Sequence, residues 1–238
     1  MKHIDLQTWR KVLVTGDDAI PWLDDLISAG VSGLRDGESR QSLLLTPTGR
    51  IRAHFHVAMH DGAALLLQDP IQPRAIADLL APYVLSSKVE MVVQDELRVF
   101  AVPAGDELRF AFGRPEGEPA DYGTWCIKRG IPRFGVDLDE ESLPQEAGWE
   151  RFIDFTKGCF MGQEAMAKIQ NFGGHPNRVV LARRSSEPVN AGEAVLTDGE
   201  EVGLVTSAAG RDLIARVAWR SRDARLQTSA GVELSDRA

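Results

Sequence analysis

The segment Lys157-Gly158-Cys159-Phe160-Met161-Gly162-Gln163-Glu164 is the most informative stretch of this 238-residue chain. Upstream of it, residues 151–155 alternate polar and apolar side chains, as a half-buried strand does. Downstream, residues 164–170 contain Ala, Met and Ile in a pattern typical of a helix with one apolar side. Gly158 and Gly162 are expected to let the backbone turn sharply between the two elements. The segment therefore predicts a strand–turn–helix corner that carries one cysteine.

Cys159 has two interpretations from its chemistry alone. A thiol just before a helix lies near the positive end of the helix dipole, and Lys157 is two residues away. Both effects favour the thiolate, so Cys159 is a candidate reactive residue and Lys157 its candidate support. The alternative is a small buried residue at a tight corner, which is what most free cysteines are. Gln163 and Glu164 are equally ambiguous, since acids are common in any first helical turn.

Composition narrows the class of protein. A hydrophobic content of 43% over 238 residues can bury one large core or two small ones. Cys126 and Cys159 are too few for a disulfide framework and wrongly spaced for a zinc site. The formal net charge of -8 argues against broad nucleic-acid binding. A basic patch at residues 216–225 remains open, although acidic residues among its arginines favour an ordinary solvated face. We find no apolar run of membrane-spanning length and no signal or transit peptide, and expect a cytoplasmic protein in a reducing compartment.

The first hundred residues interleave expected strands with two helices, which predicts an α+β fold with helices on one face of a sheet. Asp17 and Asp18 are expected to cap the first helix. Asp61-Gly62 is a hairpin signal. The expected strands are 12–15, 42–45, 51–59, 64–67, 88–93 and 97–102, and the expected helices are 19–27 and 71–85.

His54 and His56 share one face of the expected strand 51–59. Two histidines two residues apart suggest a metal site, but no third ligand of suitable spacing is present, and zinc needs three or four. We therefore expect no metal there and interpret this face as a polar surface turned to solvent or ligand.

The rest of the chain changes character twice. Residues 103–123 are rich in Pro and Gly and read as a connector with one short strand, followed by a short helix at 121–129. We place the domain boundary near Gly173-Gly174, which gives an α+β domain at 1–174 and a second domain at 175–238. The second domain has strands near 179–182, 194–196, 202–207 and 213–219 without helices between them. This pattern predicts a small C-terminal β-barrel or sandwich.

Several motifs together resemble those of one protein family. Lys-Gly-Cys-Phe-x-Gly-Gln-Glu at 157–164 resembles the signature of the YgfZ-type folate-binding proteins, relatives of the glycine-cleavage T-protein (GcvT). Weaker similarity covers the segments 44–51, 83–89, 130–146 and 203–207, in the order expected for that family. The octapeptide is the specific part of the resemblance, and the other segments only support it.

The resemblance implies ring-like T-protein-type α/β lobes with a small C-terminal β-barrel, and a tetrahydrofolate cofactor in the central hole. It also implies an accessory role in the maturation or repair of iron–sulfur proteins, acting on these proteins or their assembly factors and indirectly on tRNA modification. The thiol of Cys159 would be the key group. Gly158, Gly162, Gln163, Glu164 and Glu146 are the candidate folate-binding residues. The chain is short for the family, and the second lobe is abbreviated around residues 103–123.

Two departures from the family pattern bear on function. T-protein relatives carry an aspartate needed for aminomethyl transfer where this chain reads Ala53-His54. Neither side chain can replace a fixed carboxylate. Lys128 stands where relatives carry a glutamate, and lysine offers only hydrogen-bond donors to a pterin edge that seeks an acceptor. We therefore expect an accessory factor more than an aminomethyltransferase. A folate-dependent one-carbon transferase is the alternative, and a protein-binding module without folate is a third.

Overall fold

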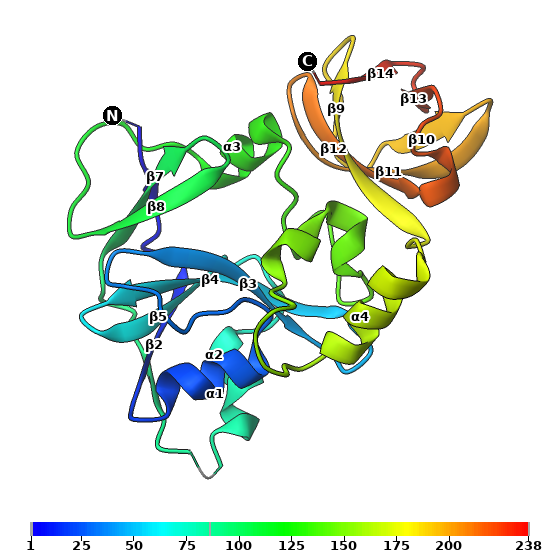
Figure 1. Cartoon of the computed structure of the whole chain (residues 1–238). Helices are drawn as coiled ribbons and strands as arrows, with labels where there is room; N and C mark the ends of the chain where they lie inside the picture. Colours follow the sequence, from blue (N-terminus) through cyan, green and yellow to red (C-terminus); the bar gives the residue numbers. More distant parts are fainter. Residues whose placement is uncertain (1, 86, 238) are drawn as a thin grey trace. The chain divides into compact units, whose positions relative to one another are not determined.

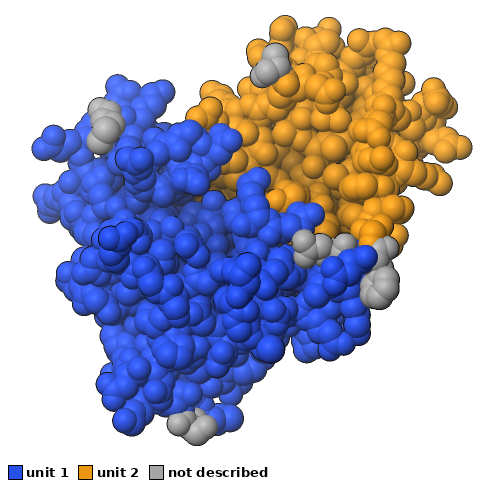
Figure 2. All heavy atoms as spheres, in the orientation of Figure 1, with its two compact units in different colours: residues 1–120, 150–172 blue, residues 121–149, 173–238 orange. Residues whose placement is uncertain are grey.

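The computed structural model describes residues 2–85 and 87–237, with all their side chains except those of Gln170 and Phe172. The chain forms two compact units (Figure 2). Unit 1 comprises Met1–Ala120 and Glu150–Phe172, and unit 2 comprises Asp121–Trp149 and Gly173–Ala238. The last passage between the units lies between Phe172 and Gly173. The segment 121–149, which the sequence suggested belongs to the first domain, groups with the C-terminal residues instead.

Unit 1 is built on an antiparallel five-stranded sheet with the strand order β3-β4-β5-β2-β6 (Figure 1). Asp61 and Gly62 both have positive φ, as the tight turn of the β4–β5 hairpin requires. The strands are β2 (Arg10–Thr15), β3 (Ser39–Leu45), β4 (Ile51–His60), β5 (Ala63–Gln68) and β6 (Glu90–Val93). The α+β sheet that the sequence predicts is confirmed.

Two helices cover one face of this sheet, α1 (Ala19–Leu26) and α2 (Ile76–Leu80). The inward residues of β4, including Phe55 and Val57, pack with Trp22 and Leu23 of α1 in one buried cluster. Asp18 precedes α1 but makes no side-chain cap, because its carboxylate accepts from the backbone N–H of Lys88. The capping role that the sequence predicts for Asp18 is therefore wrong.

The second expected helix is shorter than the sequence predicts. α2 ends at Leu80 and a 3₁₀ turn, η1 (Ala81–Tyr83), follows it. Pro73 disfavours a helical conformation in the residue before it. Pro82 lacks a backbone N–H, so it cannot continue α2 and is accepted only in the first turn of a following helix. Both prolines therefore shorten the helix from its two ends. Ser86, in the 83–89 segment used for the family resemblance, lies outside the described residues.

A three-stranded sheet with the order β1-β7-β8 lies over the other face of the main sheet in unit 1. It consists of β1 (Ile4–Asp5), β7 (Val99–Ala104) and β8 (Glu107–Phe112). Phe110 of β8 meets His56 edge-on at 4.9 Å, and Phe112 stacks on His60. His56, covered by Phe110, is only 5% exposed, and His54, covered by Phe152, is only 8% exposed. The expectation that they face solvent or ligand is wrong.

Unit 2 contains a closed barrel with the order β10-β11-β12-β9-β14-β13. Its strands are β9 (Arg178–Ser185), β10 (Ala194–Thr197), β11 (Glu200–Ala209), β12 (Asp212–Ala218), β13 (Leu226–Thr228) and β14 (Glu233–Asp236), with η4 (Trp219–Ser221) after β12. Alternate residues such as Val195, Val205 and Leu213 fill its interior. The predicted C-terminal β-barrel is confirmed, with β13 and β14 as strands that the sequence did not reveal.

The segment 121–149 is fixed to the barrel by polar contacts. It contains α3 (Tyr122–Arg129) and η2 (Pro144–Ala147). Asp137 is buried, and its carboxylate accepts from the hydroxyls of Thr206 and Ser207 on β11, at 2.5 and 2.7 Å. Burial raises the pKa of Asp137, whereas these hydrogen bonds lower it. The charged form of the carboxylate is therefore stabilised by the two hydroxyls. Within the described ranges, no helix combines the length and apolar character needed to cross a membrane.

Candidate functional site

The cysteine motif lies wholly in unit 1. It follows η3 (Trp149–Phe152) and ends in the first turn of α4 (Gln163–Phe172). The predicted helix after the motif is confirmed as α4. The predicted strand at 151–155 is wrong. The backbone there bonds to Ser28 instead of to a strand, because Phe152 C=O accepts from the Ser28 hydroxyl at 2.7 Å and Asp154 N–H donates to Ser28 C=O at 2.9 Å.

Gly162 is the residue that lets the motif reach α4. Its φ is +85°, and a Cβ at this position would lie 2.6 Å from the carbonyl oxygen of Thr46 and 2.9 Å from the Cβ of Leu45. Any side chain would therefore collide with the β3–β4 turn. Gly158 differs, since a Cβ there would meet nothing within 4 Å and its φ is not positive. Of the two glycines predicted to shape the turn, only Gly162 is required by the backbone.

Apolar residues after Cys159 hold the motif against the sheet and the helices. Phe160 is buried, Met166 is fully buried, and the Met161 sulfur accepts from the Tyr83 hydroxyl at 3.7 Å. Cys159 itself is an exposed free thiol. The buried interpretation of this cysteine is therefore excluded, and the motif presents the thiol at the surface from an anchored loop.

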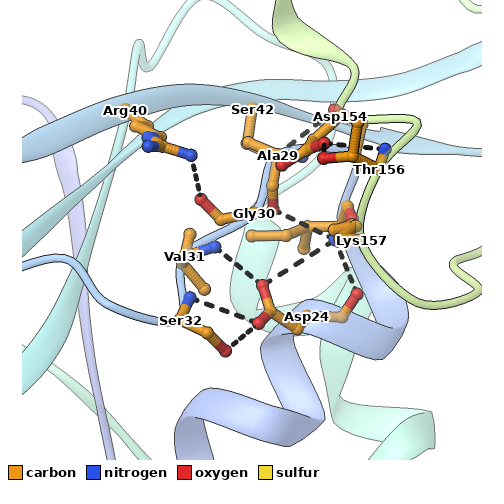
Figure 3. A network of polar contacts seen from close by, with 12 residues as sticks. Asp24, Ala29, Gly30, Val31, Ser32, Arg40, Ser42, Asp154, Thr156 and Lys157 are labelled. Atoms are coloured by element: carbon orange, nitrogen blue, oxygen red, sulfur yellow. Dashed lines mark hydrogen bonds and ion pairs between the residues drawn. The ribbon is translucent and has the colours of Figure 1, made fainter.

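Lys157 is directed away from solvent, and its side chain is only 9% exposed. Its ammonium donates to the carbonyls of Asp24, Ile27 and Ala29 at 2.6, 2.5 and 3.0 Å (Figure 3). These carbonyls belong to the last turn of α1 and the residues after it, where no helical N–H is left to bond them. All three donors of the ammonium are thus used at the end of α1.

The charge on Lys157 is balanced by nearby carboxylates. The Asp24 carboxylate lies 3.9 Å from the ammonium and also accepts from the backbone N–H of Val31 at 2.7 Å. Burial lowers the pKa of Lys157, and the charges of Asp24 and Asp154 oppose that shift. The sequence suggested that Lys157 keeps Cys159 ionised. In the structure the Lys157 ammonium instead binds the end of α1 and so joins the cysteine loop to that helix.

Asp154 and Gly30 complete this contact between the motif and the loop after α1. The Asp154 carboxylate accepts from the N–H and hydroxyl of Thr156, which lowers its pKa. A Cβ on Gly30 would lie 2.6 Å from that carboxylate. Arg40 of β3 donates to the Gly30 carbonyl at 2.7 Å (Figure 3). Asp24, Asp154 and Arg40 were missed from the sequence, because the contacts that join the motif to α1 span more than 100 residues.

Gln163 and Glu164 form the first turn of α4 next to the cysteine loop. Gln163 is half-buried, and its N–H donates to the Phe160 carbonyl at 3.2 Å. Glu164 is exposed and pairs with Lys168 one turn later, which lowers the pKa of its carboxyl group. Both side chains of this turn are accessible to a ligand that binds beside Cys159.

Glu146 belongs to unit 2 and is engaged there. One carboxylate oxygen accepts from Arg216 at 2.7 and 3.0 Å, and the other accepts from the backbone N–H of Leu143 at 3.2 Å. Both Glu146 and Arg216 are nearly buried, at 7% and 11% side-chain exposure. Arg216 also pairs with Asp139, so it is no part of an open basic patch. We interpret Glu146 as an ion-pair residue that holds η2 on the barrel.

His54 and His56 are held neutral by their surroundings. His54 stacks on Phe152 at 5.5 Å, and its Nε2 lies 3.0 Å from the Gln41 side-chain oxygen. Burial lowers the pKa of His56 to about 3 and that of His54 well below its ordinary value. In the part of the chain that the structure describes, no group of three potential metal ligands occurs.

Comparison with solved structures decides the fold. The crystal structure of glycine cleavage system aminomethyltransferase T from Bartonella henselae matches all of this chain and 85% of its own, with a TM-score of 0.83 and 16% identity. The chain has the T-protein fold. The T-protein-type architecture and the C-terminal barrel predicted from the sequence are thus confirmed, while 16% identity shows the fold alone.

Sequence relatives extend this picture, although no family model matches the chain. A chloroplastic "putative transferase" of Arabidopsis thaliana is 23% identical over 87% of this chain and 61% of its own length. An uncharacterized protein of Haemophilus influenzae is 24% identical, with 89% and 85% covered. An aminomethyltransferase of Thermoanaerobacter pseudethanolicus is 33% identical over 38% of this chain and 25% of its own. The chain therefore spans about three fifths of the Arabidopsis protein and a quarter of that aminomethyltransferase.

Proposed function

We propose that this chain is a tetrahydrofolate-binding accessory factor for the maturation or repair of iron–sulfur proteins, with Cys159 as its key thiol. Through such client enzymes it would indirectly support tRNA modification, with no direct contact to nucleic acid or membrane. Its setting would be the reducing cytoplasm, which suits the two free cysteines. The T-protein fold and the family resemblance of the 157–164 motif support this proposal.

The exposed thiol on an anchored loop is the observation that carries the proposal. Phe160 and Lys157 fix the backbone on both sides of Cys159 through buried contacts, while the thiol faces outward. A group held in this way reaches a partner protein without first ordering the loop that carries it. On this proposal the thiol of Cys159 loses its proton to solvent, and the thiolate binds an iron of the partner's cluster in place of a departing water or hydroxide ligand.

Folate binding is assigned to the start of α4 and the loop before it. Tetrahydrofolate, when bound, supplies a reduced pterin that carries one-carbon groups. Glu164 fits such a ligand, because its carboxylate is exposed and could accept hydrogen bonds from the pterin edge in place of Lys168. Gly158, Gly162 and Gln163 would present backbone and amide groups beside it. Glu146 does not fit, since Arg216 and Leu143 already occupy its oxygens.

A folate-dependent one-carbon transferase of the T-protein type is the second candidate. The local identity of 33% to one aminomethyltransferase and 35% to that of Moorella thermoacetica favours it. The residues of β4 argue against a transferase activity. Ala53 is fully buried, His54 is buried under Phe152, and no carboxylate occurs anywhere in Ile51–His60. An aminomethyl-transfer assay separates the two, and transfer above the rate without protein would favour the second.

Folate binding is tested by calorimetric titration with tetrahydrofolate and 5-formyltetrahydrofolate under reducing conditions. We expect a dissociation constant in the micromolar range (about -8 kcal/mol) that weakens in Glu164→Gln, with Glu150→Gln as the control. Glu150 is an exposed acid of the same unit in the element before the motif. No heat up to millimolar ligand would remove folate from the proposal.

The thiol is tested by restoration of an iron–sulfur enzyme in cells that lack this protein. Cys159→Ser should fold normally, because the side chain is exposed. It should nevertheless fail to restore the enzyme, because it lacks the thiol. Equal melting temperatures of the variant and the parent protein would establish the folding control. Full restoration by Cys159→Ser would refute the role of the thiol.

A further inference from the structure

Unit 2 carries a pocket of about 580 Å³ that has no part in the proposal above. It lies where the C-terminal end of α3 meets β9 and the end of the chain after β14. Four cationic side chains and one carboxylate line it. The lining residues are Lys128, Arg129, Ala182, Arg183, Asp236 and Arg237. The local charge is thus opposite in sign to the formal net charge of -8 of the whole chain.

Arg237 is fixed in the pocket wall by two carbonyls and one carboxylate. Its guanidinium donates to the backbone carbonyls of Ile127, at 2.7 Å, and of Lys128 in the last turn of α3. It also forms an ion pair with Asp212 at 3.8 Å. These contacts orient the guanidinium, and Asp212 offsets part of its charge.

Arg183 is held in a similar way from β9. Its side chain is 16% exposed and donates to the carbonyls of Ala182 and Arg222 at 3.2 and 3.3 Å. Its acidic partner, Asp236, lies at 2.8 Å but is 85% exposed. An ion pair with so exposed a partner is weak and readily exchanged for another anion. A stronger anion could therefore replace Asp236 on Arg183, while the two carbonyls keep the guanidinium in place.

A close approach at Gly130 brings the two arginines and the helix end together. Gly130 ends α3 with a φ of +70°, and a Cβ there would lie 2.6 Å from the Cβ of Ala182 and 3.2 Å from a guanidinium nitrogen of Arg237. The end of α3 thus packs directly on β9. Lys128 and Arg129, both exposed in the last turn of α3, then stand at the edge of the pocket.

We propose that this pocket binds a small oxyanion with two or more negative charges, a carboxylate or a phosphate. Two positioned guanidinium groups suit the planar or tetrahedral oxygens of such ligands, and the two exposed cations add long-range attraction. Folate binding is assigned above to the start of α4 in unit 1, although Lys128 of this pocket stands where relatives carry a glutamate. Titrating each variant with folate as well as with the anion separates failure of the anion site from failure of the folate proposal.

The test is calorimetric titration with pyrophosphate and with citrate at low ionic strength. We expect saturable binding of at least one, weakened tenfold or more by Lys128→Glu and by Arg129→Glu. The matched control is Arg184→Glu, an exposed arginine of the same strand that does not line the pocket. Because neighbouring residues of a strand point to opposite sides, Arg184→Glu should weaken binding much less than Lys128→Glu does.

Comparing the two anions distinguishes a phosphate ligand from a carboxylate ligand. Preference for pyrophosphate would assign the pocket to a phosphorylated metabolite, and preference for citrate to an oligocarboxylate. The proposal is overturned if neither anion binds at 10 mM, or if Arg184→Glu weakens binding as much as Lys128→Glu does. The second result would mean that only the general charge of unit 2 attracts the anion.

Discussion

Replacing Lys157 by Met removes the ammonium that joins the cysteine loop to α1 and keeps the apolar stem. A hydrogen bond to a charged group contributes about 1.5–3 kcal/mol, and Lys157 makes three of them. The sum overstates the effect, because burying the ammonium is itself costly, as its lowered pKa indicates. Removing one partner of a buried charged contact typically destabilises by about 3–5 kcal/mol. We expect Lys157→Met to lower the free energy of unfolding by about 2–4 kcal/mol.

Urea denaturation and hydrogen exchange measure this effect together. With a urea dependence of about 2–3 kcal/mol per M, the midpoint of unit 1 should fall by about 1 M. Backbone exchange should rise in the peptides covering 19–32 and 153–162, the two segments that Lys157 joins. The control is Lys168→Met on α4, where the lysine side chain is 64% exposed. Its stability should change by less than about 0.5 kcal/mol. A midpoint unchanged in Lys157→Met, with exchange unaltered in both peptides, would refute the tethering role.

Three further predictions concern histidine, glycine and a buried ion pair. His56 is neutral when folded with a pKa of about 3, against 6.5 when unfolded, so stability is complete above pH 6.5 and falls as the pH drops toward 3. By pH 5 the loss from His56 alone should reach about 2 kcal/mol. His56→Gln should remove this part of the acid-dependent drop in the urea midpoint, while buried His54 keeps the remainder. Gly162→Ala should destabilise unit 1 by about 1–3 kcal/mol through its positive φ and its contact with the β3–β4 turn. Gly158→Ala should be nearly neutral, and equal melting temperatures for the two variants would contradict the argument. Arg216→Met should lower the stability of unit 2 by about 3–5 kcal/mol by leaving Glu146 unpaired, and Arg216→Met with Glu146→Gln should recover part of that loss in thermal unfolding.

Much of the fold could be predicted because local patterns determine it. The alternation in β4 correctly places Phe55 and Val57 on one face and His54 and His56 on the other. It could not show that the histidine face is covered, because the covering strand β8 contributes Phe110 from more than 50 residues away. Period-two patterns report which side chains share a face, and not what lies over that face.

The candidate site was predicted less completely, for the same reason. The position of Cys159 before a helix and the need for glycine at 162 follow from local sequence. The partners of Lys157 and Glu146 do not, since Lys157 bonds across about 130 residues and Glu146 pairs with Arg216 across 70. A long polar side chain contacts whatever lies near it in the folded structure. The closeness of Lys157 to Cys159 in the sequence therefore did not predict that its ammonium binds the carbonyls at the end of α1.

The interleaving of the two units has a consequence for biosynthesis. The chain passes between units after residues 120, 149 and 172, so no single cut separates them. While the chain is being made, the main sheet of unit 1 is complete long before the ribosome reaches the segment 150–172 that docks on it. The intervening segment 121–149 must meanwhile wait for barrel strands that have not been synthesised. The nascent protein therefore exposes unfinished surfaces of both units at once, and we expect its late folding intermediates to be the species most dependent on chaperones.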